Sequence, residues 1–576
     1  MFLRIAATLV LLSPFAALAD DHVNLSRHDD ATVAQLQAQM ASGRLTSESL
    51  TRTYIARILA FDQDGPGVNS VMELNPDALA MARRADWLRR QGKVLGPLHG
   101  IPVLLKGNID TGDRMQTTAG SFGLKGTPAQ RDATVAALLR AGGAVILGKT
   151  NLSEWANFRS FTSVSGWSGV GGQTNNPYGI NRNPCGSSSG SGAAVSANFA
   201  AVSLGTETDG SIVCPGNANG VVGIKPTVGL TSRAGVVPIS HIQDTVGPHA
   251  RTVADAAVAL SVIQSRTSDG RDAATGGVPL GWTGKTRPTN IPTDYTKFLD
   301  AQGLKGARLG VTRQGIDDAP PQVVAAFEEA LDAIEAAGAT LVDIDSTVET
   351  FPNTGNSEFV VLLFDFRNDV NAYLATRSGV PLGGKTLADA IVFNNAHADI
   401  EMPFFAQEIF ELAQSSPTSP DASFGPDFDN LTYNQSLEID RQSGVALDNA
   451  LTTLNLDAII APTDNPAWAT DLLYGDHFIF GSSSLAAPAG YPIVQVPAGM
   501  VFGIPLGISF FGTAFSEPKL IKLASGFEAV TRVRAQNPPT FAQTIPSDHI
   551  DGTTLKRPHK QQSNKPPKKH WKPRHM

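Results

Sequence analysis

Two serine clusters are the residues of this sequence best suited to acyl-transfer chemistry. Ser187, Ser188 and Ser189 form the first, and Ser211 follows Ser187 by 24 positions within a glycine-rich stretch, 171–226. A serine hydroxyl attacks a carbonyl when a base takes its proton and backbone N–H groups stabilise the resulting oxyanion. Glycines let such N–H groups approach a ligand without an intervening Cβ atom. The stretch therefore predicts a nucleophilic serine site.

The residues between the two clusters predict the elements that hold them apart. Residues 193–204 are apolar and rich in alanine, which favours a buried helix that leads into a short strand. A flexible Gly/Ser linker would not continue into such a run, nor into the apolar residues 221–224. A packed connection of this kind fixes the distance between the two groups of hydroxyls.

A nucleophile elbow is one arrangement that could activate a serine here. Residues 186–190 match G-x-S-x-G, which would make Ser188 the nucleophile. The base would then be a later histidine, such as His241, His249 or His397. An elbow must follow a strand, however, and the residues just before this motif are polar and contain a proline. The pattern is therefore a weak match.

A lysine base is the alternative. Ser516 and Lys519 match S-x-x-K, but the S-D-N and K-T-G companions of that motif are missing. Lys106 closes the apolar run 101–105, which predicts a buried strand with the lysine at its carboxyl end. For Lys106 to be half neutral at pH 7, its pKa must fall by about 3.4, which corresponds to about 4.6 kcal/mol. Burial can supply a shift of that size, so Lys106 is a candidate general base.

The order of predicted elements favours an α/β fold that positions these residues. A helix over 132–141, a pair of glycines and a strand at 144–147 are matched later by a helix over 321–337, a glycine and a strand at 340–344. Further strands are predicted at 308–311, 458–461, 493–496 and 506–511. Because strands come from both ends of the chain, we expect one large domain with a mostly buried sheet. The segment 358–414 reads as helical, with phenylalanines that mainly pack in the core and in part line a substrate channel.

The motifs around three of these residues resemble those of the amidase signature family. Lys106 in LHGIPVLLKGNID, Ser187 in NPCGSSSGSGAA and Ser211 in GTETDGSI look like the Lys, cis-Ser, Ser triad of that family. The likeness extends from the helices near Val33 to the region around Phe541 and is greatest to exported bacterial peptide amidases. It implies a single large α/β domain whose mixed central sheet is covered by helices on both faces.

The resemblance also implies a role for each residue. Ser211 would attack the amide carbonyl, and Ser187, joined to Gly186 by a cis peptide bond, would relay the proton to neutral Lys106. The oxyanion hole would consist of the backbone N–H groups of Thr208, Asp209, Gly210 and Ser211. No metal or organic cofactor would be required. Many family members have two glycines before the nucleophile, and an aspartate at 209 is unfavourable beside an oxyanion unless its side chain points away.

The activity implied is hydrolysis of a carboxamide with release of ammonia, on peptide C-terminal amides or amino-acid amides. An amidase for aryl, lipid or other small amides is the alternative within the same class. A role as an ammonia-supplying amidotransferase component is the alternative outside it. The expected partner is therefore a small-molecule or peptide amide, acted on by a monomer.

The N-terminal residues of the chain predict export. Residues 1–19 have a positive residue, an apolar run and a small-residue cleavage site, which is typical of a secretory signal and too short for a membrane anchor. We therefore expect a secreted or periplasmic protein, with the amidase domain at 20–550. Residues 551–576 are basic, and their composition predicts a disordered tail. The formal charge of −8 includes this basic tail, so the rest of the chain is more acidic still. A strongly acidic protein is a poor partner for nucleic acid, whose backbone is also negative.

Two pairs of residues remain to be interpreted: two cysteines and an Asp–His pair. Cys185 and Cys214 lie beside the serine clusters. They could form a disulfide, they could be a pair of buried thiols, or their positions could be a coincidence. Asp476 and His477 are too sparse for a metal site and are interpreted as surface residues.

Overall fold

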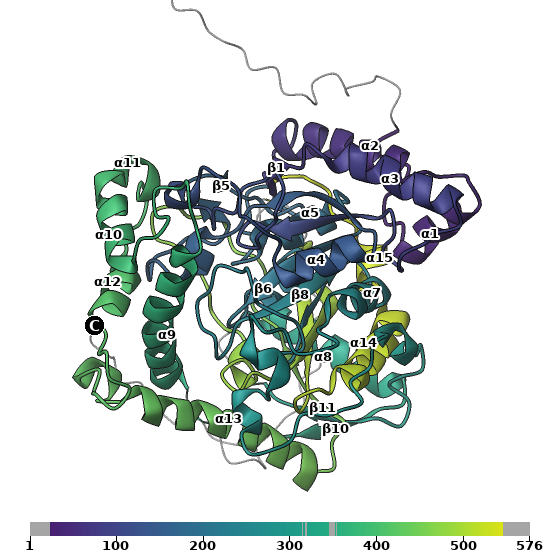
Figure 1. The fold of residues 1–576 in the computed structure, drawn as a ribbon. Helices are drawn as coiled ribbons and strands as arrows, with labels where there is room; N and C mark the ends of the chain where they lie inside the picture. The colour runs from purple at the N-terminus through teal and green to yellow at the C-terminus, as the bar shows by residue number, and fades with distance from the viewer. Residues whose placement is uncertain (1–23, 314, 317–318, 345–351, 353, 545–576) are drawn as a thin grey trace, which may run out of the picture.

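The computed structural model describes residues 24–313, 315–316, 319–344, 352 and 354–544, and a sheet of 11 strands runs through its centre (Figure 1). In spatial order the strands are β1 (Val71–Leu74), β3 (Val145–Thr150), β2 (Pro102–Lys106), β6 (Val202–Glu207), β8 (Thr245–Ala250), β7 (Val222–Lys225), β12 (Ile493–Val501), β13 (Ile504–Phe511), β11 (Ala458–Pro462), β9 (Arg308–Val311) and β10 (Thr340–Asp343). The predicted signal at 1–19 and tail at 551–576 lie outside the described residues.

The sheet is mixed, as predicted. β2 pairs in parallel with β3 and β6, and β9 pairs in parallel with β10 and β11. The central strands from β6 to β13 pair antiparallel, and β7 lies against β12 although some 270 residues separate them in the chain. Strands from both ends of the sequence thus share one sheet, which confirms the single α/β domain.

Alternate residues of the central strands pack into different hydrophobic clusters, so helices cover both faces of the sheet. Ile460 and Val494 belong to a cluster that contains residues of α8 (Pro321–Ala336) and α14 (Glu517–Thr531). Their neighbours Ile459 and Ile493 belong to another cluster, which includes α6 (Val213–Ala218) and α13 (Tyr433–Thr453). Successive side chains of a strand point to opposite faces, so these clusters are the two layers of the core.

The remaining helices surround this core (Figure 1). They are α1 (Val33–Ala41), α2 (Ser47–Arg57), α3 (Ala78–Arg90), α4 (Thr134–Ala141), α5 (Ser189–Ser196), α7 (Val253–Ile263), α9 (Gly355–Ala375), α10 (Leu387–Ala396), α11 (Ala398–Glu401), α12 (Glu408–Ser415) and α15 (Val533–Gln536). A short hairpin joins β4 (Trp167–Ser168) and β5 (Gly172–Gln173). Figure 1 shows α9 to α12 together on one side of the molecule. None of the described helices combines the length and the apolar composition needed to cross a membrane.

Several elements have no counterpart among the predicted ones, and α7, α13 and β8 are among them. The inner face of α13 buries Ser436, Asp440, Ser443 and Gly444, so it lacks the apolar period that signals a helix. β8 has the sequence TVGPHA, in which a glycine and a proline do not favour a strand. Its Gly247 is required by packing, because a Cβ at this position would lie 1.9 Å from the carbonyl oxygen of Ile224. Propensity is overridden by tertiary packing in both cases.

Candidate active site

Lys106 lies at the carboxyl end of β2 and its side chain is fully buried. Its Nζ donates to the hydroxyl of Ser187 at 2.8 Å and to the hydroxyl of Thr206 at 2.8 Å. Thr206 belongs to β6, which pairs in parallel with β2 through Leu105 and Leu204. Because parallel strands end at the same edge of a sheet, this pairing aligns the lysine with the loop that follows β6.

Burial makes Lys106 suitable as a base. Desolvation lowers its pKa from 10.5 to about 7, although the carboxyl groups of Asp244 and Glu207 oppose the change. Glu207 accepts hydrogen bonds from the backbone N–H groups of Ile212 and Val213, and burial raises its own pKa. A substantial fraction of Lys106 is therefore neutral at pH 7, in line with the sequence expectation.

Ser187 connects Lys106 to Ser211. The hydroxyl of Ser187 donates to that of Ser211 at 3.0 Å, and the peptide bond between Gly186 and Ser187 is cis, as expected. The backbone N–H of Ser188 donates to the carbonyl oxygen of Ser211 at 3.1 Å, which holds the two serine segments together. The structure thus brings the three residues into one hydrogen-bonded chain.

The loop 208–211 lines the cavity in front of Ser211. All four of its residues line that cavity, and none of its four N–H groups has an acceptor among the described residues. Gly210 has φ of +78°, a left-handed conformation that favours glycine. The side chain of Asp209 accepts a hydrogen bond from the hydroxyl of Ser484 at 2.5 Å. A loop that lines a cavity and has unpaired N–H groups can supply the donors of an oxyanion hole.

The two competing arrangements do not form. The hydroxyl of Ser188 donates to the carbonyl oxygen of Thr206 and accepts from its N–H, so it has no histidine partner among the described residues. His249 is buried with its Nε2 2.8 Å from the carbonyl oxygen of Ile212. Lys519 is exposed and pairs with Asp457, so it is not placed to act as a base for Ser516.

The cavity in front of Ser211 has a volume of about 420 Å³, within the range of small-molecule sites. Its wall includes residues from distant segments that sequence reasoning missed: Glu358, Asp464, Trp468, Phe478 and Ser484. These positions carry no local motif, so only the fold could reveal them. Phe359 also lines the cavity, whereas Phe366 and Phe410 pack in the core, as predicted for the aromatic segment.

The surface interpretation of Asp476 was wrong. Asp476 lines the cavity and accepts hydrogen bonds from the backbone N–H of Ser165 and the side chain of Asn183. Its neighbour His477 is exposed and pairs with Asp471. Asp476 is held inward because it satisfies donors from two loops.

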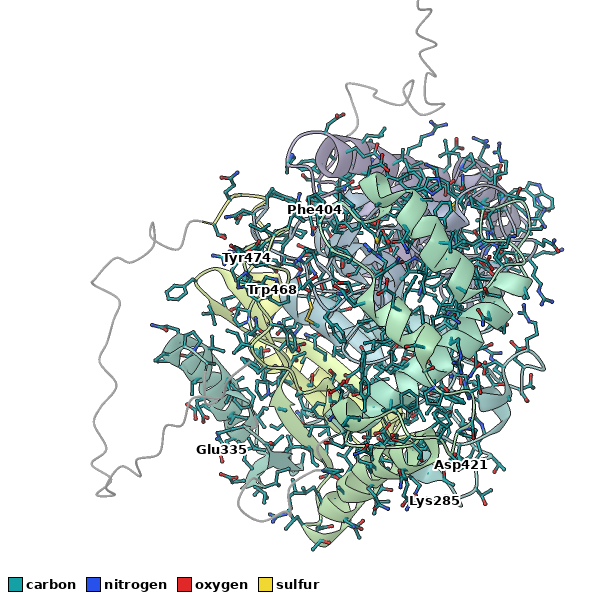
Figure 2. The ribbon with its side chains drawn as sticks, turned by 90° about the vertical axis from the view of Figure 1, so that its left-hand side faces the viewer. Lys285, Glu335, Phe404, Asp421, Trp468 and Tyr474 are labelled. Carbon is teal, nitrogen blue, oxygen red and sulfur yellow. A yellow bond between two sulfur atoms is a disulfide. The ribbon has the colours of Figure 1, made fainter. Side chains whose placement is uncertain are left out.

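Cys185 and Cys214 form a disulfide, which resolves the alternatives left open by the sequence. The bridge joins the residue before Gly186 to the first turn of α6, close to Ser211. Trp468 packs against it in a small hydrophobic cluster, and Figure 2 shows the sulfur–sulfur bond beside this residue. The disulfide therefore ties the two serine segments together covalently.

A buried ion pair supports the wall of the cavity at residues 156–158. Arg159 and Glu154 are both fully buried, and Nε of Arg159 lies 3.0 Å from Oε1 of Glu154. The guanidinium group also donates to the carbonyl oxygens of Glu401, Phe405 and Ala406 and lies over the ring of Phe405. This group therefore ties the wall to α11 and the segment that precedes α12.

Replacement of Arg159 by methionine is expected to lower the free energy of unfolding by about 3–5 kcal/mol, because it leaves a buried carboxyl group and three carbonyl oxygens without their partner. Urea unfolding followed by fluorescence would measure the change. Arg441→Met is the matched control, since Arg441 pairs with exposed Glu438 and such pairs contribute less than about 1 kcal/mol. A loss below about 1 kcal/mol for Arg159→Met would contradict the assigned role.

Comparisons with known proteins agree with this fold. The family model described as Amidase matches residues 49–521. A probable amidase of Arabidopsis thaliana is 41% identical over 517 residues, which cover 89% of this chain and 92% of that protein. A glutamyl-tRNA(Gln) amidotransferase subunit of Chloroflexus aurantiacus is 32% identical, over 88% of this chain and 98% of its own.

Solved structures agree as well. The native peptide amidase of Stenotrophomonas maltophilia is 44% identical and superimposes with a TM-score of 0.80, over 89% of this chain and 99% of its own. An amidase family protein from Bacillus anthracis is 33% identical with a TM-score of 0.76, over 92% and 96% of the two chains. The chain therefore belongs to the amidase signature family of amide-hydrolysing enzymes.

Proposed function

We propose that this amidase hydrolyses the C-terminal carboxamides of peptides, or amino-acid amides, and releases ammonia. The hydrogen-bonded chain from Ser211 through Ser187 to Lys106 carries the proposal, because it connects a nucleophile to a base of which burial keeps a substantial fraction neutral at pH 7. The similarity to the Stenotrophomonas peptide amidase supports the class of substrate.

The first half of the reaction forms an acyl-enzyme. The Oγ of Ser211 attacks the carbonyl carbon, while its proton passes to Ser187, whose own proton passes to Nζ of Lys106. Negative charge develops on the carbonyl oxygen, where the N–H groups of loop 208–211 stabilise it. The proton then returns from Lys106 through Ser187 to the amide nitrogen, the C–N bond breaks, and ammonia leaves.

The second half releases the acid. A water molecule attacks the ester carbonyl of the acyl-enzyme and gives its proton to the same relay. The tetrahedral intermediate expels Oγ of Ser211, which regains a proton from Ser187. The enzyme returns to its initial state with every proton accounted for by the relay and the attacking water.

We also propose that the enzyme acts as an exported monomer. The signal-like residues 1–19 support export. The disulfide between Cys185 and Cys214 supports it too, since disulfides persist in oxidising compartments.

An activity panel tests the proposed function. The purified chain alone would be incubated with an amidated dipeptide, an amino-acid amide, an acyl anilide and a long-chain fatty amide, and ammonia or aniline would be measured. We expect ammonia from the first two at a kcat/KM at least about tenfold above the others. Preference for the anilide or the fatty amide would favour the alternative substrates. No turnover without a partner protein would refute the proposal in favour of an ammonia-supplying component of a larger complex.

A further inference from the structure

Four carboxyl side chains line the cavity in front of Ser211, and they come from three separate segments: the loop 208–211, α9 and the connection that follows β11. They are Asp209, Glu358, Asp464 and Asp476. None of the described residues that line this cavity is lysine, arginine or histidine. The cavity is therefore strongly acidic and lacks its own counter-charge.

We call these four carboxyl groups the acidic wall. Among them, Asp464 gives the clearest indication of a bound ligand. Its side chain is only 1% exposed, and its Oδ2 has no hydrogen-bond partner among the described residues. A Cβ on Gly481 would lie only 2.4 Å from Oδ1 of Asp464. The glycine at position 481 therefore makes space for this carboxyl group. A buried carboxyl group with an unpaired oxygen is costly unless a ligand supplies the partner.

Asp209 and Glu358 complete the acidic wall. Oδ1 of Asp209 is also buried without a partner among the described residues, whereas Glu358 accepts a hydrogen bond from the side chain of Gln243 at 2.7 Å. Burial raises the pKa values of Glu358 and Asp464 well above their ordinary range; the charge of Asp209 adds to the effect on Glu358, and the charges of Glu207 and Asp209 add to the effect on Asp464. Protonation relieves the repulsion in the free enzyme, and a bound cation replaces those protons.

The spacing of these groups suits an organic cation better than a metal ion. Among the described residues, the one set of three or more potential ligands close enough to share an ion is His241, Asp365 and Asp369. That set lines or adjoins a different cavity, and His241 there already pairs with Asp369 at 2.9 Å. The carboxyl groups before Ser211 are not in the set, so they do not converge on one ion.

Aromatic rings supply the rest of the surface that an organic cation needs. Phe158, Phe359, Trp468 and Phe478 line the same cavity. The face of an aromatic ring attracts a guanidinium or ammonium group, and ring edges and faces also pack against its aliphatic stem. Carboxyl groups and aromatic rings thus surround a volume that suits one amino-acid side chain.

We propose that Asp209, Glu358 and Asp464 bind a cationic group of the substrate, so that the enzyme selects carboxamides that carry a guanidinium or ammonium group near the scissile bond. Asp209 lies two residues before Ser211, which places the subsite next to the reacting carbonyl. The inference rests on the proposed function, because it concerns the side chain or amino terminus of the same amide substrate.

Two matched pairs of substrates test the inference on the wild-type enzyme. N-acetylargininamide and N-acetylcitrullinamide differ in the charge of a side chain of equal length. Leucinamide and N-acetylleucinamide differ in the charge of the α-amino group. We expect kcat/KM for the cationic member of at least one pair to exceed that of its neutral partner by about tenfold or more, and the pair that responds identifies the cation.

Two variants then assign the effect to the carboxyl groups. Asp464→Asn and Glu358→Gln are each expected to reduce the cationic-to-neutral ratio to below about threefold. Glu335→Gln is the matched control, because Glu335 is exposed on α8, far from Trp468 in Figure 2, and should leave the ratio unchanged.

The outcomes separate this inference from the proposed function. Ratios within about twofold for both pairs, or a preference for the neutral members, would overturn the inference and leave the proposed function intact. Ratios that stay high in both variants would overturn the assignment to these carboxyl groups. No ammonia from any of the four amides would refute the proposed function itself.

Discussion

Replacing Ser211 by alanine is expected to lower kcat for ammonia release by more than about 10⁴-fold, because it removes the attacking oxygen and leaves only binding and the oxyanion hole. The hydroxyl of Ser211 accepts one hydrogen bond, from Ser187, at the edge of the cavity. Its loss should therefore change the free energy of unfolding by less than about 1 kcal/mol. A coupled ammonia assay and thermal unfolding would measure the two effects.

Ser188→Ala is the comparison that separates the two serine clusters. Its hydroxyl makes two hydrogen bonds to the backbone of buried Thr206, so its loss should cost about 1–3 kcal/mol of stability. We expect turnover within about tenfold of wild type. If instead Ser211→Ala were active and Ser188→Ala were folded but inactive, the result would favour the nucleophile elbow, with Ser188 as the nucleophile.

Replacing Lys106 by methionine is expected to lower kcat by about 10³–10⁴-fold and at the same time to stabilise the fold. The pKa of Lys106 falls from 10.5 to about 7 on burial, and keeping the amine neutral at pH 7 costs about 4 kcal/mol. Methionine has a similar length and avoids that cost, although its partners Ser187 and Thr206 lose hydrogen bonds. The net gain should be about 1–3 kcal/mol. A large destabilisation with retained turnover would show that the lysine is structural.

The same lysine fixes the pH dependence of the wild-type enzyme. Only the neutral amine can accept a proton, so kcat/KM for a neutral amide should rise with pH and level off above about 7. The folded pKa lies below the unfolded one, so Lys106 destabilises the protein at neutral pH, and this penalty shrinks as the pH rises towards 10.5. The residual activity of Lys106→Met should lack the rise near pH 7. If both proteins had the same pH profile, the rise of kcat/KM near pH 7 would have to come from another titrating group.

The proposed cation-binding site would account for the aspartate at 209, which departs from the commonest family pattern. An aspartate at 209 would oppose an oxyanion if its carboxylate faced the carbonyl oxygen. In the structure, Asp209 is held by Ser484 and shares its surroundings with Glu358 and Asp464. The residue therefore belongs to a cluster that a cationic substrate would neutralise, which lowers its cost to the transition state.

Local sequence identified the candidate reactive residues of this protein. Lys106, Ser187 and Ser211 each lie in a short motif of glycines, small residues and apolar neighbours, and the likeness of these motifs to those of the amidase signature family identified the three together. The regular helix–glycine–strand units, such as α4 with β3, are likewise encoded by nearby residues. These features depend on interactions between residues close together in the chain.

Tertiary structure alone decided what surrounds them. Glu358, Asp464 and Asp476 come from segments with no motif, and they meet at Ser211 because β11, α9 and the loops around them converge there. The depressed pKa of Lys106 and the disulfide between Cys185 and Cys214 also exist only once distant elements pack. Desolvation and charge clustering are properties of a three-dimensional neighbourhood, so the substrate-binding wall could not be read from the sequence in the way that the nucleophile was.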